Sequence, residues 1–134
     1  MITITTYIND QYLNSYWADG LIIATPTGST GYSLSCGGPI VMPGSENFII
    51  TPIAPHNLNV RPLVISDKYK IKVKVEGRAK QFLVALDSRI QTMDAGHELT
   101  IKKESFKINM IETETQDFSS TLRNKLLWGL DKRN

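Results

Sequence analysis

Prolines and glycines are concentrated in one part of this chain and limit what that part can form. All six prolines lie between residues 26 and 62, and six of the nine glycines lie between residues 20 and 44. Because proline lacks a backbone donor and obstructs the preceding helical turn, this window cannot form a long helix. Within it, LIIA at residues 21–24 is a wholly apolar run that predicts a short buried strand.

On both sides of this window, apolar and polar residues alternate with a period of two, which is typical of strands. MITITTYI puts Ile2, Ile4 and Ile8 on one face, with threonines between them. An extended chain over residues 68–77, KYKIKVKVEG, carries four lysines on one face and four core-type side chains on the other. Further strands are predicted for QFLVAL (81–86), HELTIKK (97–103) and FKINMI (106–111), with turns at 76–77 and 94–96. The sequence therefore predicts a mainly β fold, a meander or a sandwich of short strands.

The apolar period changes to four near the end of the chain. Asp117 or Ser119 can cap a helix there, and Gly129 can close its last turn. We expect a short amphipathic helix with Phe118, Leu122, Leu126 and Leu130 on one side.

Length and composition exclude several classes of protein. With 134 residues, 41% of them hydrophobic, the chain can bury one core, and we expect a single domain over residues 1–134. A net charge of +2 is too small to indicate a nucleic-acid or membrane partner. The single cysteine, Cys36, excludes an internal disulfide and a cysteine metal cluster, and agrees with a reducing compartment. No apolar run approaches the ~20 residues that span a bilayer, so we expect a cytoplasmic protein.

The segment ATPTGSTGYSLSCGGP, residues 24–39, is the strongest candidate for a functional site. It holds four glycines, two prolines and seven hydroxyl side chains in sixteen positions. Exposed backbone amides, hydroxyls and the start of a short helix at residues 32–36, stopped by Gly37-Gly38, are suited to a phosphate or another polar ligand. The alternative is a glycine-rich turn that only connects two elements. The segment has neither the lysine of a P-loop nor the G-x-S-x-G pattern of a serine hydrolase.

Three further features each have a functional and a structural interpretation. Asp19-Gly20 is either a turn or a carboxylate held at the start of a buried strand, where it could accept from a ribose hydroxyl or an amide. His56 lies in the proline-stiffened segment TPIAPHNLNVRP, residues 51–62, without a catalytic partner in the sequence pattern. The lysines of residues 68–74 are more typical of a solvated strand face than of a phosphate site.

Three segments together resemble the C-terminal domain of NAD kinases: DGLIIATPTGSTGYSLSCGGPIV (19–41), TPIAPHNLNVRPLVI (51–65) and LRNKLLWGLDKR (122–133). The resemblance extends over nearly the whole chain. It implies a twisted β-sandwich that binds NAD, preceded in the family by an α/β domain with a Gly-Gly-Asp-Gly motif for ATP and catalysis and an Asn-Glu pair that holds the ribose. Neither motif occurs here. The chain is thus similar to the C-terminal part of an NAD kinase, beginning at an internal methionine.

The resemblance also assigns roles by position. Asp19 would contact the nicotinamide end of NAD, and Ala54 would lie beside the nucleotide with His56 close by. Family members commonly have alanine in place of Gly31, and they have Asp-Gly-Gln where this chain has Asp87-Ser88-Arg89, so Arg89 could meet a phosphate. The dinucleotide would be lined by Thr30, Gly31, Tyr32, Ser33, Leu34 and Ser35.

For an intact enzyme of this family, the implied reaction transfers the γ-phosphoryl group of ATP to the 2′-hydroxyl of the adenosine ribose of NAD. Mg²⁺ or another divalent cation would offset phosphate charge, and the general base would be the aspartate of the missing motif. We therefore expect no catalytic residue and no metal ligand in this chain, and no turnover from it alone. The family implies a homodimer or homotetramer built through this domain. Two alternatives stay open: a non-catalytic assembly module, and the C-terminal domain of a diacylglycerol-type lipid kinase.

Overall fold

The computed structural model describes residues 1–111, 113 and 117–129. The chain divides into two compact units, Met1–Lys103 and Glu104–Asn134, and each is described by itself. The first unit is mainly strand, and the described residues of the second include one helix, α2 (Phe118–Leu126). The strands are β1 (Ile2–Ile8), β2 (Gln11–Ala18), β3 (Gly20–Ala24), β4 (Asn47–Ile53), β5 (Leu63–Ser66), β6 (Ile71–Glu76), β7 (Gln81–Leu86), β8 (Arg89–Asp94) and β9 (Glu98–Ile101), with the 3-10 helix η1 (Thr27–Thr30) and the helix α1 (Tyr32–Ser35) between β3 and β4.

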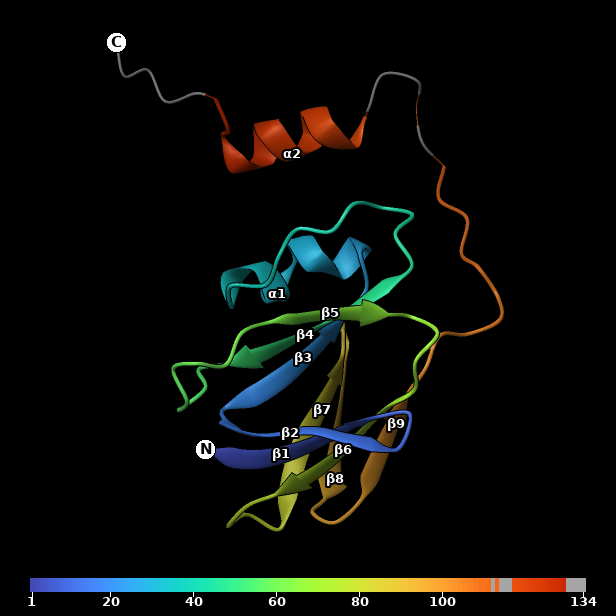
Figure 1. Ribbon diagram of the computed structural model, residues 1–134. Coiled ribbons are helices and arrows are strands. Elements are labelled where there is room, and N and C mark those ends of the chain that lie inside the picture. The colour runs from blue at the N-terminus through green and yellow to red at the C-terminus, as the bar shows by residue number, and fades with distance from the viewer. Residues whose placement is uncertain (112, 114–116, 130–134) are drawn as a thin grey trace. The chain divides into compact units, whose positions relative to one another are not determined.

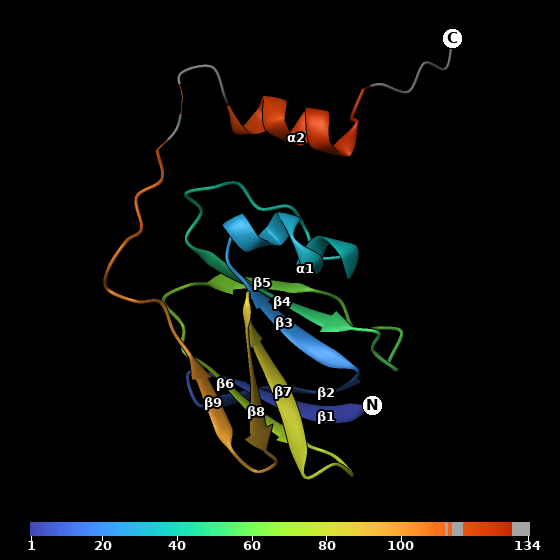
Figure 2. The ribbon, with the colours of Figure 1, turned by 180° about the vertical axis from the view of Figure 1, so that it is seen from behind.

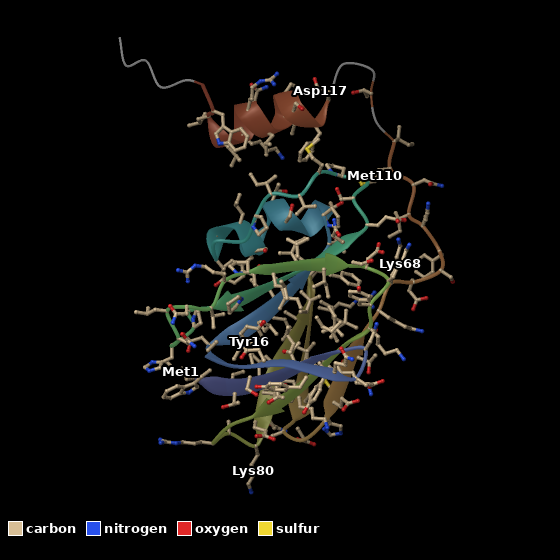
Figure 3. The ribbon with its side chains drawn as sticks, viewed as in Figure 1. Met1, Tyr16, Lys68, Lys80, Met110 and Asp117 are labelled. Atoms are coloured by element: carbon tan, nitrogen blue, oxygen red, sulfur yellow. The ribbon has the colours of Figure 1, made fainter. Side chains whose placement is uncertain are left out.

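The strands of the first unit form three antiparallel sheets, in the orders β2-β1-β6-β9, β3-β4-β5 and β7-β8. The four-stranded and three-stranded sheets pack against each other, and η1 and α1 lie on the other side of the three-stranded sheet (Figures 1 and 2). Tyr16, only 4% exposed, lies among the side chains between the sheets (Figure 3). One buried cluster joins the two sheets: Ile4, Tyr16, Ala18, Phe48, Ile50, Ile71, Val73 and Val75. The predicted β-sandwich is therefore confirmed.

The alternation in β1 is observed as the sequence predicts. Ile4 is buried, and Ile2 and Ile8 pack against the same core cluster. Thr6 lies on this inward face as well and has no exposed surface. Side chains of a strand alternate between its two faces, so one face of β1 is covered by the core and the other holds the remaining polar residues.

β4 is buried on both faces. The sequence analysis did not predict this strand, because it lies in the part of the chain that is rich in proline. Phe48 and Ile50 belong to the sandwich core, whereas Ile49 and Thr51, on the opposite face by alternation, have no exposed surface either. Pro52 is tolerated because β5 pairs only with Asn47–Ile50, so β4 has one neighbouring strand at the proline rather than two. The predicted strand at residues 21–24 is confirmed as β3, the partner of β4.

One predicted strand is wrong. The segment FKINMI, residues 106–111, forms neither helix nor strand, and Phe106, Ile108 and Met110 are exposed. An alternating sequence gives a strand two different faces, but a strand also needs a neighbour to pair with. The four-stranded sheet ends with β9, whose last residue is Ile101. The predictions for residues 81–86 and 97–103 are confirmed by β7 and β9, and that for residues 68–77 by β6 over Ile71–Glu76.

The C-terminal helix α2 is confirmed and begins at the predicted cap. The carboxylate of Asp117 accepts a hydrogen bond from the backbone N–H of Ser120 at 2.8 Å, which lowers the pKa of Asp117 below its ordinary value. At the other end Leu127 has φ +58° and Gly129 has φ +75°, a left-handed termination. Leu130 lies outside the described residues. None of the described helices has the length and apolar character required to cross a bilayer.

Candidate functional site

The glycine-rich segment is fixed to the sandwich by two buried serines. Ser29 Oγ donates to Pro26 O at 2.6 Å and accepts from the backbone N–H of Val41 at 3.0 Å, joining the two ends of the segment. Ser33 Oγ lies 2.9 Å from Thr51 Oγ1, a buried hydrogen bond between α1 and β4. A buried hydroxyl that loses its hydrogen-bond partner lowers the stability of the fold. These contacts therefore favour one path of the backbone through the segment.

Gly38 allows α1 to lie directly on β4. Its N–H donates to Ser33 O at 2.8 Å, and a Cβ at this position would overlap Ser33 Oγ and lie 2.9 Å from Thr51 Oγ1. Gly37 has φ +83°, the left-handed conformation that ends the short helix after Cys36. The predicted helix at residues 32–36, stopped by Gly37-Gly38, is thus confirmed as α1 (Tyr32–Ser35).

The same anchoring leaves a polar surface open to solvent. Thr30, Gly31, Tyr32 and Ser35 are exposed, with Tyr32 64% exposed, whereas Leu34 is half-buried. Ser33 differs from the other predicted site residues because its hydroxyl points inward to Thr51 and is 1% exposed. The segment can therefore offer a ligand its backbone and the side chains of its outer positions, while Ser33 holds it in place.

A second group of predicted residues meets where β2 turns into β3. Asp19 is the single bend residue between these strands, and its backbone N–H donates to Ile53 O at 3.0 Å, at the end of β4. The next residue, Ala54, has φ +44°, unusual for a residue with a Cβ. The carboxylate of Asp19 is 59% exposed and lies 3.7 Å from the terminal ammonium group of Met1. Asp19 and Ala54 thus form one corner, held by the β3-β4 ladder.

His56 belongs to this corner through a residue that the sequence analysis missed. The backbone N–H of His56 donates to Trp17 O at 2.9 Å, and the two rings lie 4.4 Å apart between centroids at an angle of 52°. Trp17 is 53% exposed although it lies in a strand. The available signal was its position in the sequence, two residues before Asp19.

The strand register relates the corner to α1. Ser33 contacts Thr51, which pairs with Ile22 in the middle of β3, whereas Gly20 pairs with Ile53. Ala54 follows Thr51 by three residues, or about 10 Å along a strand. The glycine-rich segment leaves β3 after Ala24, at the opposite end of the β3-β4 pair from Asp19, and α1 returns over the middle of the pair, where Ser33 contacts Thr51.

Arg89 is not brought to this site by any described hydrogen bond or ion pair. It is exposed at the first position of β8, opposite Leu86 across a two-residue turn in which Asp87 has φ +51°. Within the described residues, β8 pairs only with β7. The assignment of Arg89 to a phosphate stays a prediction.

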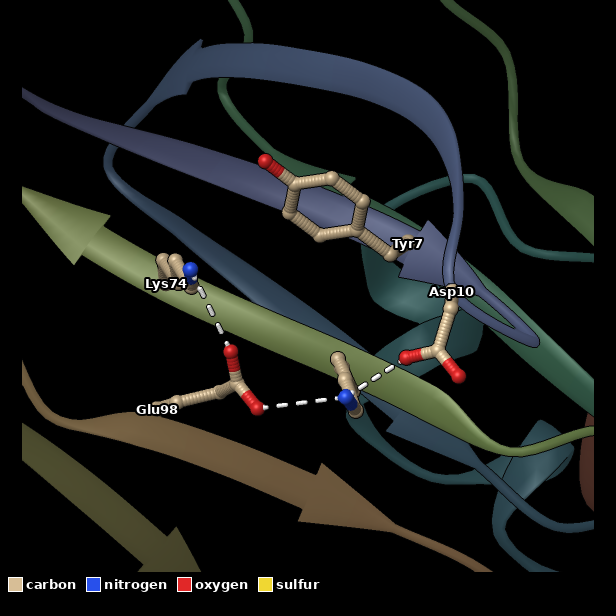
Figure 4. Close-up of a pocket in the computed structure, with 5 residues that line it drawn as sticks. Tyr7, Asp10, Lys74 and Glu98 are labelled. Carbon is tan, nitrogen blue, oxygen red and sulfur yellow. Dashed lines mark ion pairs between the residues drawn. The ribbon is translucent and has the colours of Figure 1, made fainter.

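Two of the four lysines of residues 68–74, Lys72 and Lys74, lie in β6 of the four-stranded sheet and pair with neighbouring carboxylates. Lys72 Nζ is 2.5 Å from Asp10 Oδ1 and 3.5 Å from Glu98 Oε1, and Lys74 Nζ is 3.3 Å from Glu98 Oε2 (Figure 4). The hydrogen bond and the charge of Asp10 raise the pKa of Lys72. Tyr7 completes the shallow pocket, with Lys74 Nζ 5.8 Å from its ring centre. A pocket with balanced charges agrees with a solvated strand face and offers little to a phosphate.

The acidic, histidine and cysteine side chains of the described residues are dispersed. In the part of the chain that the structure describes, no group of three or more His, Cys, Asp or Glu side chains could hold a metal ion. The Asp19 corner contributes a single carboxylate. These residues do not fit a divalent cation by themselves.

Comparison with known proteins identifies the family of this chain. A family model described as the ATP-NAD kinase C-terminal domain matches residues 1–113. NAD kinase of Flavobacterium psychrophilum is 67% identical over 134 residues, which is 100% of this chain and 46% of the relative. NAD kinase of Cytophaga hutchinsonii is 58% identical with the same coverage, 100% and 46%. The chain thus spans about half the length of the curated relatives that it matches.

Two solved structures are similar as well. The crystal structure of yeast NADH kinase complexed with NADH is 29% identical with a TM-score of 0.82, covering 96% of this chain and 40% of that one. The crystal structure of an NAD kinase from Archaeoglobus fulgidus in complex with ATP is 39% identical with a TM-score of 0.70, covering 79% and 41%. The resemblance carried by residues 19–41, 51–65 and 122–133 is therefore confirmed, and the chain belongs to the ATP-NAD kinase C-terminal domain family.

Proposed function

We propose that this chain forms the NAD-binding part of an NAD kinase. The observation that carries the proposal is the anchored glycine-rich segment. Ser29 and Ser33 are buried and hydrogen-bonded, so the outer positions of the segment present a preorganised polar surface. The similarity to NAD kinases, and to an NADH kinase solved with NADH, supports a dinucleotide as the ligand.

In this proposal the exposed residues contact different parts of the dinucleotide. Thr30 and Ser35 offer their hydroxyl groups, and Tyr32 supplies an exposed ring. The N–H of Gly31 already donates to Gly28 O at 3.0 Å, so Gly31 contributes close approach of its backbone rather than a donor. At the corner, the carboxylate of Asp19 accepts from an amide or a ribose hydroxyl, as an ionised carboxylate only accepts. The remaining proposed contacts are the backbone of Leu34 and Ser33, the backbone of Ala54, and the imidazole of His56.

The intact enzyme would transfer the γ-phosphoryl group of ATP to the 2′-hydroxyl of the adenosine ribose of NAD, giving ADP and NADP. The proton of that hydroxyl would pass to a general base outside this chain, because the sequence contains no Gly-Gly-Asp-Gly motif. Mg²⁺ or another divalent cation would offset the phosphate charge in the intact enzyme. This chain's own role is to bind and orient NAD, and we expect no NADP from it alone.

Titration calorimetry of the purified chain with NAD and with NADP tests the binding proposal. We expect binding in the wild type and a loss of about tenfold or more, roughly 1.4 kcal/mol, in Asp19→Ala and in Tyr32→Ala. Tyr12→Ala is the matched control because Tyr12 is 62% exposed, close to the 64% of Tyr32, and lies in β2 outside the candidate site. An equal loss in Tyr12→Ala, or no NAD binding by a chain that unfolds cooperatively, would contradict the proposal.

A turnover assay separates binding from catalysis. NADP formation from ATP and NAD by the purified chain, abolished by Asp19→Ala, would show that the chain carries out chemistry and would contradict the proposed division of roles. Binding without turnover is the expected result.

The assembly module is a second candidate function, favoured by exposed apolar side chains on the β7-β8 hairpin. Leu83 is 70% exposed and Ile90 is 72% exposed, and Ala85, the partner of Ile90, lies on the same face as Leu83. A homodimer or homotetramer built through this face would scatter light as a multiple of 15.0 kDa. A monomer that binds NAD would exclude assembly as this chain's function. The matched family favours an NAD kinase over a diacylglycerol-type lipid kinase.

A further inference from the structure

We propose that Trp17 is a positioning residue that sets the imidazole of His56 at the Asp19 corner for dinucleotide binding. This inference rests on the proposed function, and it assigns a role to a residue outside the glycine-rich segment. Trp17 acts through His56, which it contacts, rather than through the ligand.

Two contacts join these residues. The indole and imidazole centroids are 4.4 Å apart with the rings tilted by 52°, which is within the range of favourable aromatic pairs. The backbone N–H of His56 also donates to Trp17 O at 2.9 Å. Together they attach the loop after β4 to β2, a strand of the other sheet.

The loop after β4 is otherwise weakly restrained at Ala54 and His56. Ala54 is in the left-handed conformation at φ +44°, and both it and His56 are exposed, so little packing restrains them. An exposed side chain without a packed neighbour samples several rotamers, and ordering it on binding costs free energy. Stacking on Trp17 orders the imidazole before the ligand arrives.

Trp17 lies outside the core of the sandwich. Its side chain is 53% exposed, and it is absent from the buried core cluster and from the partly buried residues around it. Truncating Trp17 should therefore disturb His56 and leave the sandwich folded. This separation makes the proposal testable by substitution.

The first measurement is the NMR spectrum of the histidine rings. The chain has two histidines, His56 and His97, so His97 is an internal reference. The indole ring current should shift the His56 ring protons in the wild type. That shift should disappear in Trp17→Leu, which keeps apolar bulk without a ring, and be partly retained in Trp17→Phe. An unshifted His56 in the wild type would overturn the stacking on which the proposal depends.

The second measurement is calorimetric titration of the same variants with NAD. We expect a threefold to tenfold weaker Kd in Trp17→Leu, recovery in Trp17→Phe, and no additional loss when Trp17→Leu is combined with His56→Ala. Wild-type affinity in Trp17→Leu, or an additive loss in the double variant, would overturn the positioning role. If the wild type does not bind NAD while His56 keeps its ring-current shift, both the proposed function and the role of Trp17 in binding are refuted. The stacked pair would then be a structural contact only.

Discussion

Two threonines with no exposed surface differ in what their hydroxyl groups contact. Thr51 Oγ1 shares a hydrogen bond with Ser33 Oγ at 2.9 Å. Thr6 Oγ1 is equally buried and has no hydrogen-bond partner among the described residues. A buried hydroxyl stabilises the fold only when it is paired, so the two positions should respond oppositely to the same substitution.

We predict that Thr6→Val stabilises the chain by about 1 kcal/mol and that Thr51→Val destabilises it by about 1–3 kcal/mol, since the second change leaves Ser33 Oγ buried and unpaired. Urea unfolding of both variants and of the wild type measures these changes. Each threonine is the control for the other, and a loss of stability in Thr6→Val equal to that in Thr51→Val would contradict this account.

Gly38 has a steric rather than a conformational role. We predict that Gly38→Ala destabilises the chain by about 1–3 kcal/mol, because a Cβ would collide with Ser33 and Thr51, which are held by their mutual hydrogen bond. Thermal unfolding checks this. Gly28→Ala is the matched control, since its Cβ would meet only Ala24 Cβ at 3.5 Å and Thr25 Oγ1 at 3.6 Å. A smaller effect at Gly38 than at Gly28 would show that α1 can move away from β4.

At this scale the sequence predicted which residues are in the site segment but not which way they point. Ser33 and Ser35 have the same chemistry and differ by two positions, yet the first is buried on Thr51 and the second is exposed. Orientation depends on β4, which comes later in the chain and pairs with β3. Trp17 was missed for the same reason, because its contact with His56 joins β2 to the loop after β4, which lies far away in the sequence.

Among the elements, helix α2 has a start that depends on an ionised side chain. The hydrogen bond from Ser120 lowers the pKa of Asp117 below its unfolded value of about 3.9. The stabilisation is therefore fully present above the unfolded pKa and is lost as the pH falls through the folded pKa.

We predict that the first turn of α2 loses helicity as the pH is lowered from 5 to 2, observed as movement of the Phe118–Ser120 Cα chemical shifts toward unfolded values. Asp117→Asn keeps a capping oxygen without a titrating group, so its helix should be insensitive over this range. Equal pH dependence in Asp117→Asn would assign the effect to another residue.

The period of apolar residues predicted strands correctly where one face of the strand packs on the core. It could not predict whether a neighbouring strand is available for pairing. β1, β3, β6, β7 and β9 coincide with predicted strands, and α2 with the predicted helix. β2, β4 and β8 carried no clear signal in the sequence analysis; β4 contains a proline and is covered on both faces. Residues 106–111 have the alternation of a strand without a neighbour in the ladder.

In the whole first unit, the layers explain why the candidate site lies where it does. The three-stranded sheet is covered by the sandwich core on one face and by η1 and α1 on the other, which accounts for a middle strand without exposed residues from Phe48 to Pro52 (Figure 1). In the layer of η1 and α1, Ser29 and Ser33 are buried and anchor the segment, and the exposed residues include Thr30, Tyr32 and Ser35. The resemblance to a known family predicted the ligand class, and pattern analysis alone did not.

We propose that the glycine-rich segment and the Asp19 corner form one dinucleotide-binding surface in this chain. Amide chemical-shift mapping during titration with NAD measures this surface residue by residue. We expect the amides of Thr30–Ser35 to shift together with those of Asp19 and Ala54, while those of Lys72 and Lys74 on the four-stranded sheet do not. Shifts centred on Lys72 and Lys74, or no shifts in a folded chain at millimolar NAD, would contradict it.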